Sequence, residues 1–121
     1  MIEIRNSKQF DLEERTFNFS KQVRSFVKKI PKTLVNIDDL KQLIRSSGSV
    51  GANYIEANEA LSKKDFLLRI KICRKEAKES RYWLKLIEIF EDKEIEKERR
   101  HLENEANELM MIFGSIVRKT E

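Results

Sequence analysis

The residue pattern in this sequence that is most suited to chemistry is a row of basic side chains in the segment 71–85. The row advances in steps of three and four residues, which places most of its members on one outward face of a helix. Tyr82 and Trp83 lie within it and could offer stacking surfaces to bases. A helical row of cations can follow phosphates, so these positions are our candidate contacts to RNA or DNA. The row consists of Lys71, Arg74, Lys75, Lys78, Arg81 and Lys85.

The same charges have a plainer interpretation. The segment 63–85 holds nine basic and three acidic residues, whereas the segment 91–121 holds six basic and nine acidic residues. The basic row could therefore be a solvated helix face, or it could form salt bridges with the acidic segment. Both interpretations stay open at the level of the sequence.

Other residue types that could support catalysis lack the partners they need. A ferritin-like di-iron site requires two Glu-x-x-His pairs, and His101, the single histidine, allows only the pair with Glu98. Cys73 falls on an apolar stripe, so we expect it to pack in the core. Glu76 and Glu79 stand among cations, which favours ion pairs over acid–base work. We therefore predict no catalytic residue, no metal ligand, no cofactor and no enzymatic activity.

Composition restricts the fold class. The chain has 121 residues, of which 40% are hydrophobic and 38% charged, with three glycines and one proline. So few turn-forming residues argue against a β-sandwich or barrel. One cysteine excludes an internal disulfide framework and fits a reducing compartment. No apolar run is long enough for a signal peptide or a membrane span, so we expect a cytoplasmic protein with no membrane partner.

Helical periodicity of apolar residues predicts one domain, residues 1–121, with four helices. Asp11 is the expected cap of the first helix, Asp38 or Asp39 opens the second, and Ser62 caps the third. Pro31 follows the end of the first helix. Four amphipathic helices with short joints predict an all-α, antiparallel up-and-down four-helix bundle. The predicted helices span about 11–30, 38–59, 63–90 and 93–118.

The middle of the second predicted helix is rich in small residues. Residues 46–52 read SSGSVGA, and each glycine inside a helix costs roughly 1 kcal/mol relative to alanine. A loop would fit this composition, but the apolar periodicity keeps its phase on both sides. We therefore predict an unbroken helix in which the small residues allow close approach of a neighbouring helix.

Three runs of residues carry a family resemblance. They are RSSGSVGANYIEAN at 45–58, SKKDF at 62–66 and KEAKESRYWL at 75–84. Together they resemble the bacterial four-helix-bundle family encoded in intervening sequences of 23S ribosomal RNA genes, also called the S23 ribosomal protein family. The resemblance covers about residues 10–118.

This resemblance implies a four-helix bundle that assembles as a homopentameric ring, in a family whose members mostly have no assigned activity. A related branch, the accessory variability proteins of diversity-generating retroelements, works with a reverse transcriptase and nucleic acid. The family has no catalytic residues to transfer to this chain. We therefore expect the family's signature positions to have structural roles in this chain. They are Asn53, Glu56, Phe66, Glu76, Glu79 and Trp83.

Two functions from different classes follow as expectations. The first is a non-enzymatic, homo-oligomeric accessory protein that binds RNA or DNA through the basic row. The alternative is a structural or protein–protein interaction module with no nucleic-acid role. Oligomerisation is expected in addition because large side chains fall beside the core seams, where a neighbouring subunit could bury them. Examples are Phe17, Tyr54, Trp83 and Met111.

Overall fold

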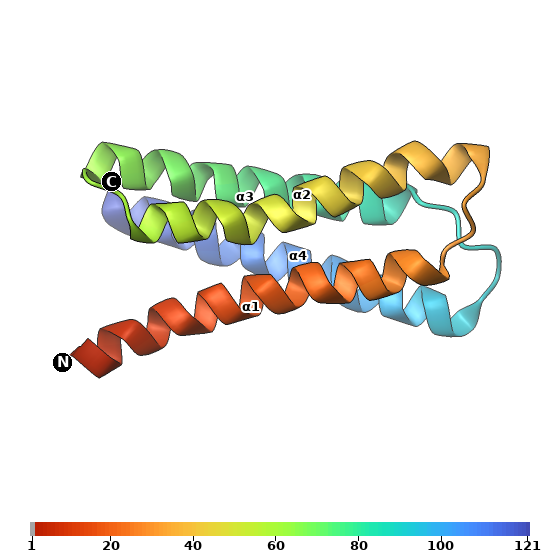
Figure 1. Ribbon diagram of the computed structural model, residues 1–121, viewed down its shortest axis with the longest axis horizontal. Helices are drawn as coiled ribbons and strands as arrows, with labels where there is room; N and C mark the ends of the chain where they lie inside the picture. Colours follow the sequence, from red (N-terminus) through yellow and green to blue (C-terminus); the bar gives the residue numbers. More distant parts are fainter. Residues whose placement is uncertain (1) are drawn as a thin grey trace.

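The computed structural model describes the backbone of residues 2–121 and the side chains of residues 12–121. Four helices follow one another along the chain and form an antiparallel up-and-down bundle (Figure 1). Each helix packs against the next one, and α1 also packs against α4. The all-α four-helix fold predicted from the sequence is confirmed. The helices are α1 (Ile2–Lys29), α2 (Leu34–Asn58), α3 (Lys63–Leu86) and α4 (Lys93–Thr120).

The first two helices begin earlier than predicted. α1 begins at Ile2, so Asp11 lies inside a helix and the prediction that it is the cap was wrong. A formed helix extends at little cost per residue, so it need not begin where its apolar seam begins. α2 is capped by Thr33, whose side chain accepts a hydrogen bond from the amide of Asn36, and not by Asp38 or Asp39. Threonine is also a favoured N-cap residue, and Thr33 lies two residues after the Pro31 break.

Ser62 caps α3 as predicted, because its hydroxyl accepts a hydrogen bond from the amide of Asp65 at 3.0 Å. The end of α3 was predicted about four residues too late. The helix ends at Leu86, and the chain then turns through Phe90 and Glu91, whose φ angles are 51° and 52°. These left-handed residues reverse the chain before Asp92 caps α4.

The joint between α3 and α4 is held to the joint between α1 and α2 by one buried amide. The side-chain nitrogen of Asn36 donates to the carbonyl oxygens of Pro31 at 3.1 Å and Glu88 at 2.8 Å. Its side-chain oxygen accepts from the amide of Glu88 at 3.0 Å. Asn36 is completely buried, so this clamp fixes one end of the bundle.

The core runs along the bundle axis and takes side chains from all four helices. Its largest fully buried members include Phe19, Leu43, Ile70 and Phe113. Tyr54 is only 5% exposed and packs against Phe113, with ring centroids 5.8 Å apart. The expectation that Tyr54 is left for a neighbouring subunit was therefore wrong, because the ring fills space inside its own bundle.

α2 runs unbroken through residues 46–52, as predicted. Two neighbouring helices use the small residues there. On the α3 side, the buried hydroxyls of Ser46 and Ser80 form a hydrogen bond at 2.9 Å. On the α1 side, a Cβ atom placed on Gly51 would lie 2.9 Å from the Thr16 hydroxyl oxygen. Small residues therefore let α2 approach both neighbours closely.

Candidate nucleic-acid interface

The six basic residues predicted as nucleic-acid contacts all lie on α3, away from its buried stripe. Lys71, Lys75, Lys78 and Lys85 are exposed. The two arginines of the row, Arg74 and Arg81, are half-buried. The structure thus brings the row together on one side of α3, as the helical spacing predicts.

Four of these cations line a groove between α3 and α4 with a volume of about 800 Å³. α4 forms the other wall and adds a fifth cation, Arg118, which the sequence analysis missed. The spacing of Met111, Gly114 and Arg118 by three and four residues shows that they share a face of α4, but not that this face borders the basic row. The groove is lined by Lys71, Arg74, Lys75, Lys78, Met110, Met111, Ile112, Gly114, Ser115 and Arg118.

Gly114 brings the two arginines of the groove together over the backbone of α4. A Cβ atom at this position would lie 3.4 Å from a terminal nitrogen of Arg118 and 3.7 Å from the Cδ atom of Arg74. With no side chain on Gly114, both guanidinium-bearing chains can lie across α4 at this point. Two positive charges are therefore concentrated at the same stretch of the groove.

Few of these cations have an acidic partner. Lys71 lies 3.5 Å from the carboxylate of Glu121. Arg81 donates instead to the neutral side-chain oxygen of Asn107 on α4, at 2.5 Å. The remaining cations of the row and groove form no ion pair with any residue whose side chain the structure describes. They are Arg74, Lys75, Lys78, Lys85 and Arg118.

The acidic residues of α4 are used elsewhere. Arg15 on α1 binds Glu105 through two hydrogen bonds of 2.7 and 2.9 Å and Glu108 through a third of 2.8 Å. Lys29, also on α1, pairs with Glu98 at 2.8 Å. Glu98, Glu105 and Glu108 thus bind α1, and Glu96 and Glu103 bind arginines of α4 itself. Among the described residues, the alternative in which the acidic segment 91–121 neutralises the basic row holds only for Lys71 and Glu121.

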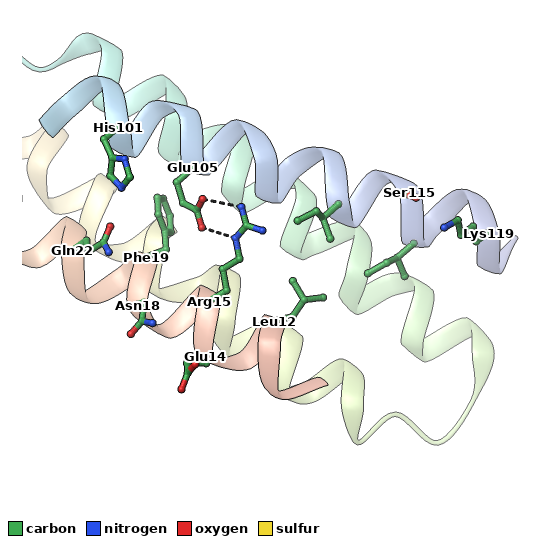
Figure 2. Close-up of a pocket in the computed structure, with 12 residues that line it drawn as sticks. Leu12, Glu14, Arg15, Asn18, Phe19, Gln22, His101, Glu105, Ser115 and Lys119 are labelled. Atoms are coloured by element: carbon green, nitrogen blue, oxygen red, sulfur yellow. Dashed lines mark hydrogen bonds and ion pairs between the residues drawn. The ribbon is translucent and has the colours of Figure 1, made fainter. Parts of the chain in front are cut away.

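A second groove, of about 710 Å³, lies between α1 and α4 (Figure 2). Figure 2 shows the Arg15 guanidinium reaching across it to the Glu105 carboxylate. Hydrogen bonding to Glu105 raises the pKa of Arg15 above its ordinary value. This groove is lined by Arg15 and Lys119 but also by Glu14 and Glu105, so it lacks the excess of positive charge of the α3–α4 groove.

The two aromatic residues in the basic row have different environments. Tyr82 is 58% exposed, whereas Trp83 is half-buried. Their rings pack edge to face, with centroids 5.0 Å apart and an interplanar angle of 76°. The indole nitrogen of Trp83 is buried and has no hydrogen-bond partner in the described part of the chain. Of the two predicted stacking surfaces, Tyr82 is therefore the one open to a ligand.

Glu76 and Glu79 form ion pairs, as expected, but not with the neighbouring cations of α3. Both bind Arg45 of α2, at 3.3 and 3.1 Å. A second link between these helices joins Arg69 to the side-chain oxygen of Asn53 at 3.0 Å. These contacts support the expected structural role of Asn53 and Glu76, because each residue connects α2 to α3.

The remaining candidates for catalysis and metal binding have the following surroundings. Cys73 is fully buried, and burial raises the pKa of its thiol to about 12. His101 is exposed beside the buried Leu102. Among the described residues, no group of three or more His, Cys, Asp or Glu side chains could hold a metal ion. The same part of the chain contains no helix that is long and apolar enough to cross a membrane.

The fold and the groove define the class of protein as an antiparallel four-helix bundle with a basic surface groove. Residues 8–115 match the model of the 23S rRNA-intervening sequence protein family. The chain therefore belongs to the 23S rRNA-intervening sequence protein family. No curated protein matches it.

A solved structure supports the same assignment. The chain is similar to a protein with unknown function from the S23 ribosomal protein family of Bacteroides thetaiotaomicron, with 30% sequence identity and a TM-score of 0.71. The match covers 88% of this chain and 97% of that one. The predicted family resemblance is thereby confirmed.

Proposed function

We propose that this protein is a non-enzymatic, homo-oligomeric accessory protein that binds RNA or DNA through the α3–α4 groove. The observation that carries the proposal is the grouping of five cations around one open groove, of which only Lys71 has an acidic partner among the described residues. Uncompensated positive charges on a concave surface attract phosphates and release the counterions bound to them.

Binding of this kind is expected to be insensitive to sequence. Lysine and arginine side chains spaced along a helix face match a row of phosphates, whereas sequence is read by contacts to base edges. Such phosphate-only binding typically has a Kd of roughly 10⁻⁴ to 10⁻⁶ M at physiological salt. A single subunit is thus expected to bind weakly.

Assembly would strengthen weak binding. Several large apolar side chains outside the α3–α4 groove remain exposed on the single chain, among them Phe17 at 61% and Ile55 at 51%. We propose that they are buried between copies of the chain in a ring, pentameric as the family resemblance implies. A ring carries several basic grooves, so that a strand bound to one groove is held near the next. Light scattering at micromolar concentration tests this point, and a monomer mass would contradict it.

One observation favours a second function, that of a protein–protein interaction module. Three exposed apolar residues lie near the clamped end of the bundle, close to the joints that Asn36 connects. They are Leu34 at 92%, Val35 at 58% and Phe90 at 58% exposure. Apolar surface at a helix bundle's end is typical of a docking site for another protein. A measurement of binding to nucleic acid distinguishes the two functions.

The test compares the wild type with two triple variants of equal charge. The first replaces Lys71, Lys75 and Lys78 with glutamate in the groove. The matched control replaces Lys21, Lys28 and Lys41, which are exposed on α1 and α2. Both variants change the net charge from +4 to −2. Circular dichroism should show an intact fold for both, because exposed salt bridges contribute only about 0–1 kcal/mol each.

Fluorescence anisotropy with labelled RNA and DNA at low salt gives the readout. We expect the groove variant to lose most of its binding and the control variant to keep most of it. Equal loss in both variants would mean that net charge alone drives binding. No binding by the wild type would favour the interaction module.

A further inference from the structure

An exposed aromatic ring stands within the lysine row of α3. Tyr82 comes four residues after Lys78 and three before Lys85, so it shares their helix face. Its ring is 58% exposed and is held from one side by the half-buried Trp83. A large apolar ring surrounded by solvated cations buries little surface in the folded chain. Core packing therefore does not account for it.

We propose that the nucleic acid bound here is single-stranded, with its phosphates along the lysine row and one base stacked on Tyr82. This inference rests on the function proposed above. Every base has a flat π-face, so stacking on an aromatic side chain adds affinity without requiring a particular sequence. The edge-to-face contact with Trp83 restricts the Tyr82 ring before the base arrives, which reduces the entropy lost on binding.

A duplex fits these observations less well. Its base faces are covered by their stacked neighbours, so an exposed ring cannot reach one without unstacking the helix. The groove also has an apolar wall that includes Met110 and the 60% exposed Met111. A phosphate backbone alone leaves this wall uncovered, whereas the free bases of a single strand can lie against it. The cations and the apolar surfaces together match the two chemical parts of an unpaired strand.

The experiment measures four ligands against four proteins. The ligands are labelled 15-nucleotide single strands of RNA and DNA with one mixed sequence, and the corresponding 15-base-pair duplexes. The proteins are the wild type, Tyr82→Ala, Tyr82→Leu and Tyr82→Phe. Leucine keeps apolar bulk beside Trp83 without a π-face, and phenylalanine keeps the π-face without the hydroxyl. Circular dichroism checks that each variant is folded.

We expect Tyr82→Ala and Tyr82→Leu to weaken single-strand binding about tenfold, within the range measured for the loss of one stacked base. Tyr82→Phe should remain within about twofold of the wild type. Duplex binding should be weaker than single-strand binding and indifferent to all three substitutions. RNA and DNA should behave alike, since phosphates and base faces are common to both.

The outcomes separate this inference from the function on which it rests. If the lysine variant of the groove loses binding but Tyr82→Ala and Tyr82→Leu do not, the phosphate interface stands and the stacked base is excluded. Equal weakening of single strands and duplexes by Tyr82→Ala would also exclude it. If the wild type binds none of the four ligands, the proposed function itself fails.

Discussion

Gly51 of α2 lies against Thr16 of α1 so closely that no side chain fits between them. A Cβ atom on Gly51 would lie 2.9 Å from the Thr16 hydroxyl oxygen and 3.3 Å from its Cβ atom. Thr16 is buried, and its hydroxyl donates to the carbonyl oxygen of Leu12 at 2.7 Å, so it has little freedom to move. The approach of α1 to α2 therefore depends on glycine at this position.

Gly51→Ala is predicted to destabilise the protein despite the better helix propensity of alanine. Propensity favours alanine by about 1 kcal/mol, but overpacking a tight contact costs about 1–3 kcal/mol. The matched control is Gly48→Ala, three residues earlier in the same helix. Its Cβ atom would meet the flexible end of Arg24 at 3.5 Å and the Ser20 hydroxyl oxygen at 3.8 Å, which are ordinary contact distances, so we expect a gain of up to about 1 kcal/mol. Urea denaturation measures both, and a stabilised Gly51→Ala would contradict the close approach.

Asn36→Asp is predicted to be one of the most damaging conservative substitutions in the chain. The Asn36 side-chain nitrogen donates to the carbonyl oxygens of Pro31 and Glu88. A carboxylate there would face two carbonyl oxygens in a buried site and lose both hydrogen bonds. We expect a loss of about 3 kcal/mol or more in the free energy of unfolding at pH 7. Urea denaturation is the measurement, and a loss below about 1 kcal/mol would show that the clamp carries little stability.

The ion pair between Arg45 and Glu76 is predicted to stabilise the fold because it neutralises the buried carboxylate of Glu76. The Glu76 side chain is only 8% exposed, whereas that of Arg45 is 50% exposed. Arg45→Ala leaves the carboxylate without its charged partner, and we expect a loss of about 1–2 kcal/mol. In the background of Glu76→Gln, the same change should cost less, because no buried charge remains. A double-mutant cycle by urea denaturation gives the coupling, and additive effects would contradict this account.

Cys73 is predicted to be unreactive in the folded protein. It is also predicted to make the free energy of unfolding fall as the pH rises into the alkaline range. Burial raises the pKa of its thiol from 9.0 to about 12, so the unfolded chain releases this proton first. The thiol's effect on the free energy of unfolding is constant well below pH 9. Stability then falls as the pH rises from about 9 towards 12, by at most about 1.4 kcal/mol per unit. Cys73→Ala should lack this part of the decline.

Two measurements check the Cys73 prediction. Urea denaturation between pH 7 and 10 compares the wild type with Cys73→Ala. A thiol reagent at pH 8 should modify Cys73 only when urea unfolds the chain. Rapid modification of the folded protein would show that the thiol is accessible and would contradict its burial.

Apolar periodicity was sufficient to predict the fold, because each helix of a bundle must show one apolar face. It could not place the helix starts at Ile2 and Leu34, since a helix can extend past the residues that pack. The Asn36 clamp was missed for a different reason. It depends on the backbone of Glu88 lying beside Asn36 in space, and Glu88 is 52 residues from Asn36 in the chain.

The candidate site was predictable only in part. The spacing of Lys71, Lys75 and Lys78 fixed their common face, because helix geometry is local. The neighbouring helix that completes the groove depends on tertiary packing, so Arg118 and the open position at Gly114 were not found. The partners of the α4 carboxylates could not be predicted from the sequence either, because they too depend on tertiary packing. Only the structure shows that these carboxylates pair with α1 or within α4 and leave most of the basic row unpaired.

The salt dependence of binding tests the central claim most directly. Wild type, the Lys71/Lys75/Lys78 glutamate variant and the Lys21/Lys28/Lys41 control are titrated with single-stranded nucleic acid at several salt concentrations. Each phosphate contact contributes about 0.7 to the slope of log K against log salt on a single strand. We predict that the groove variant loses about 2 from the slope, whereas the control keeps the slope of the wild type. Equal slopes for all three proteins would contradict the assignment of the α3–α4 groove as the phosphate-binding surface.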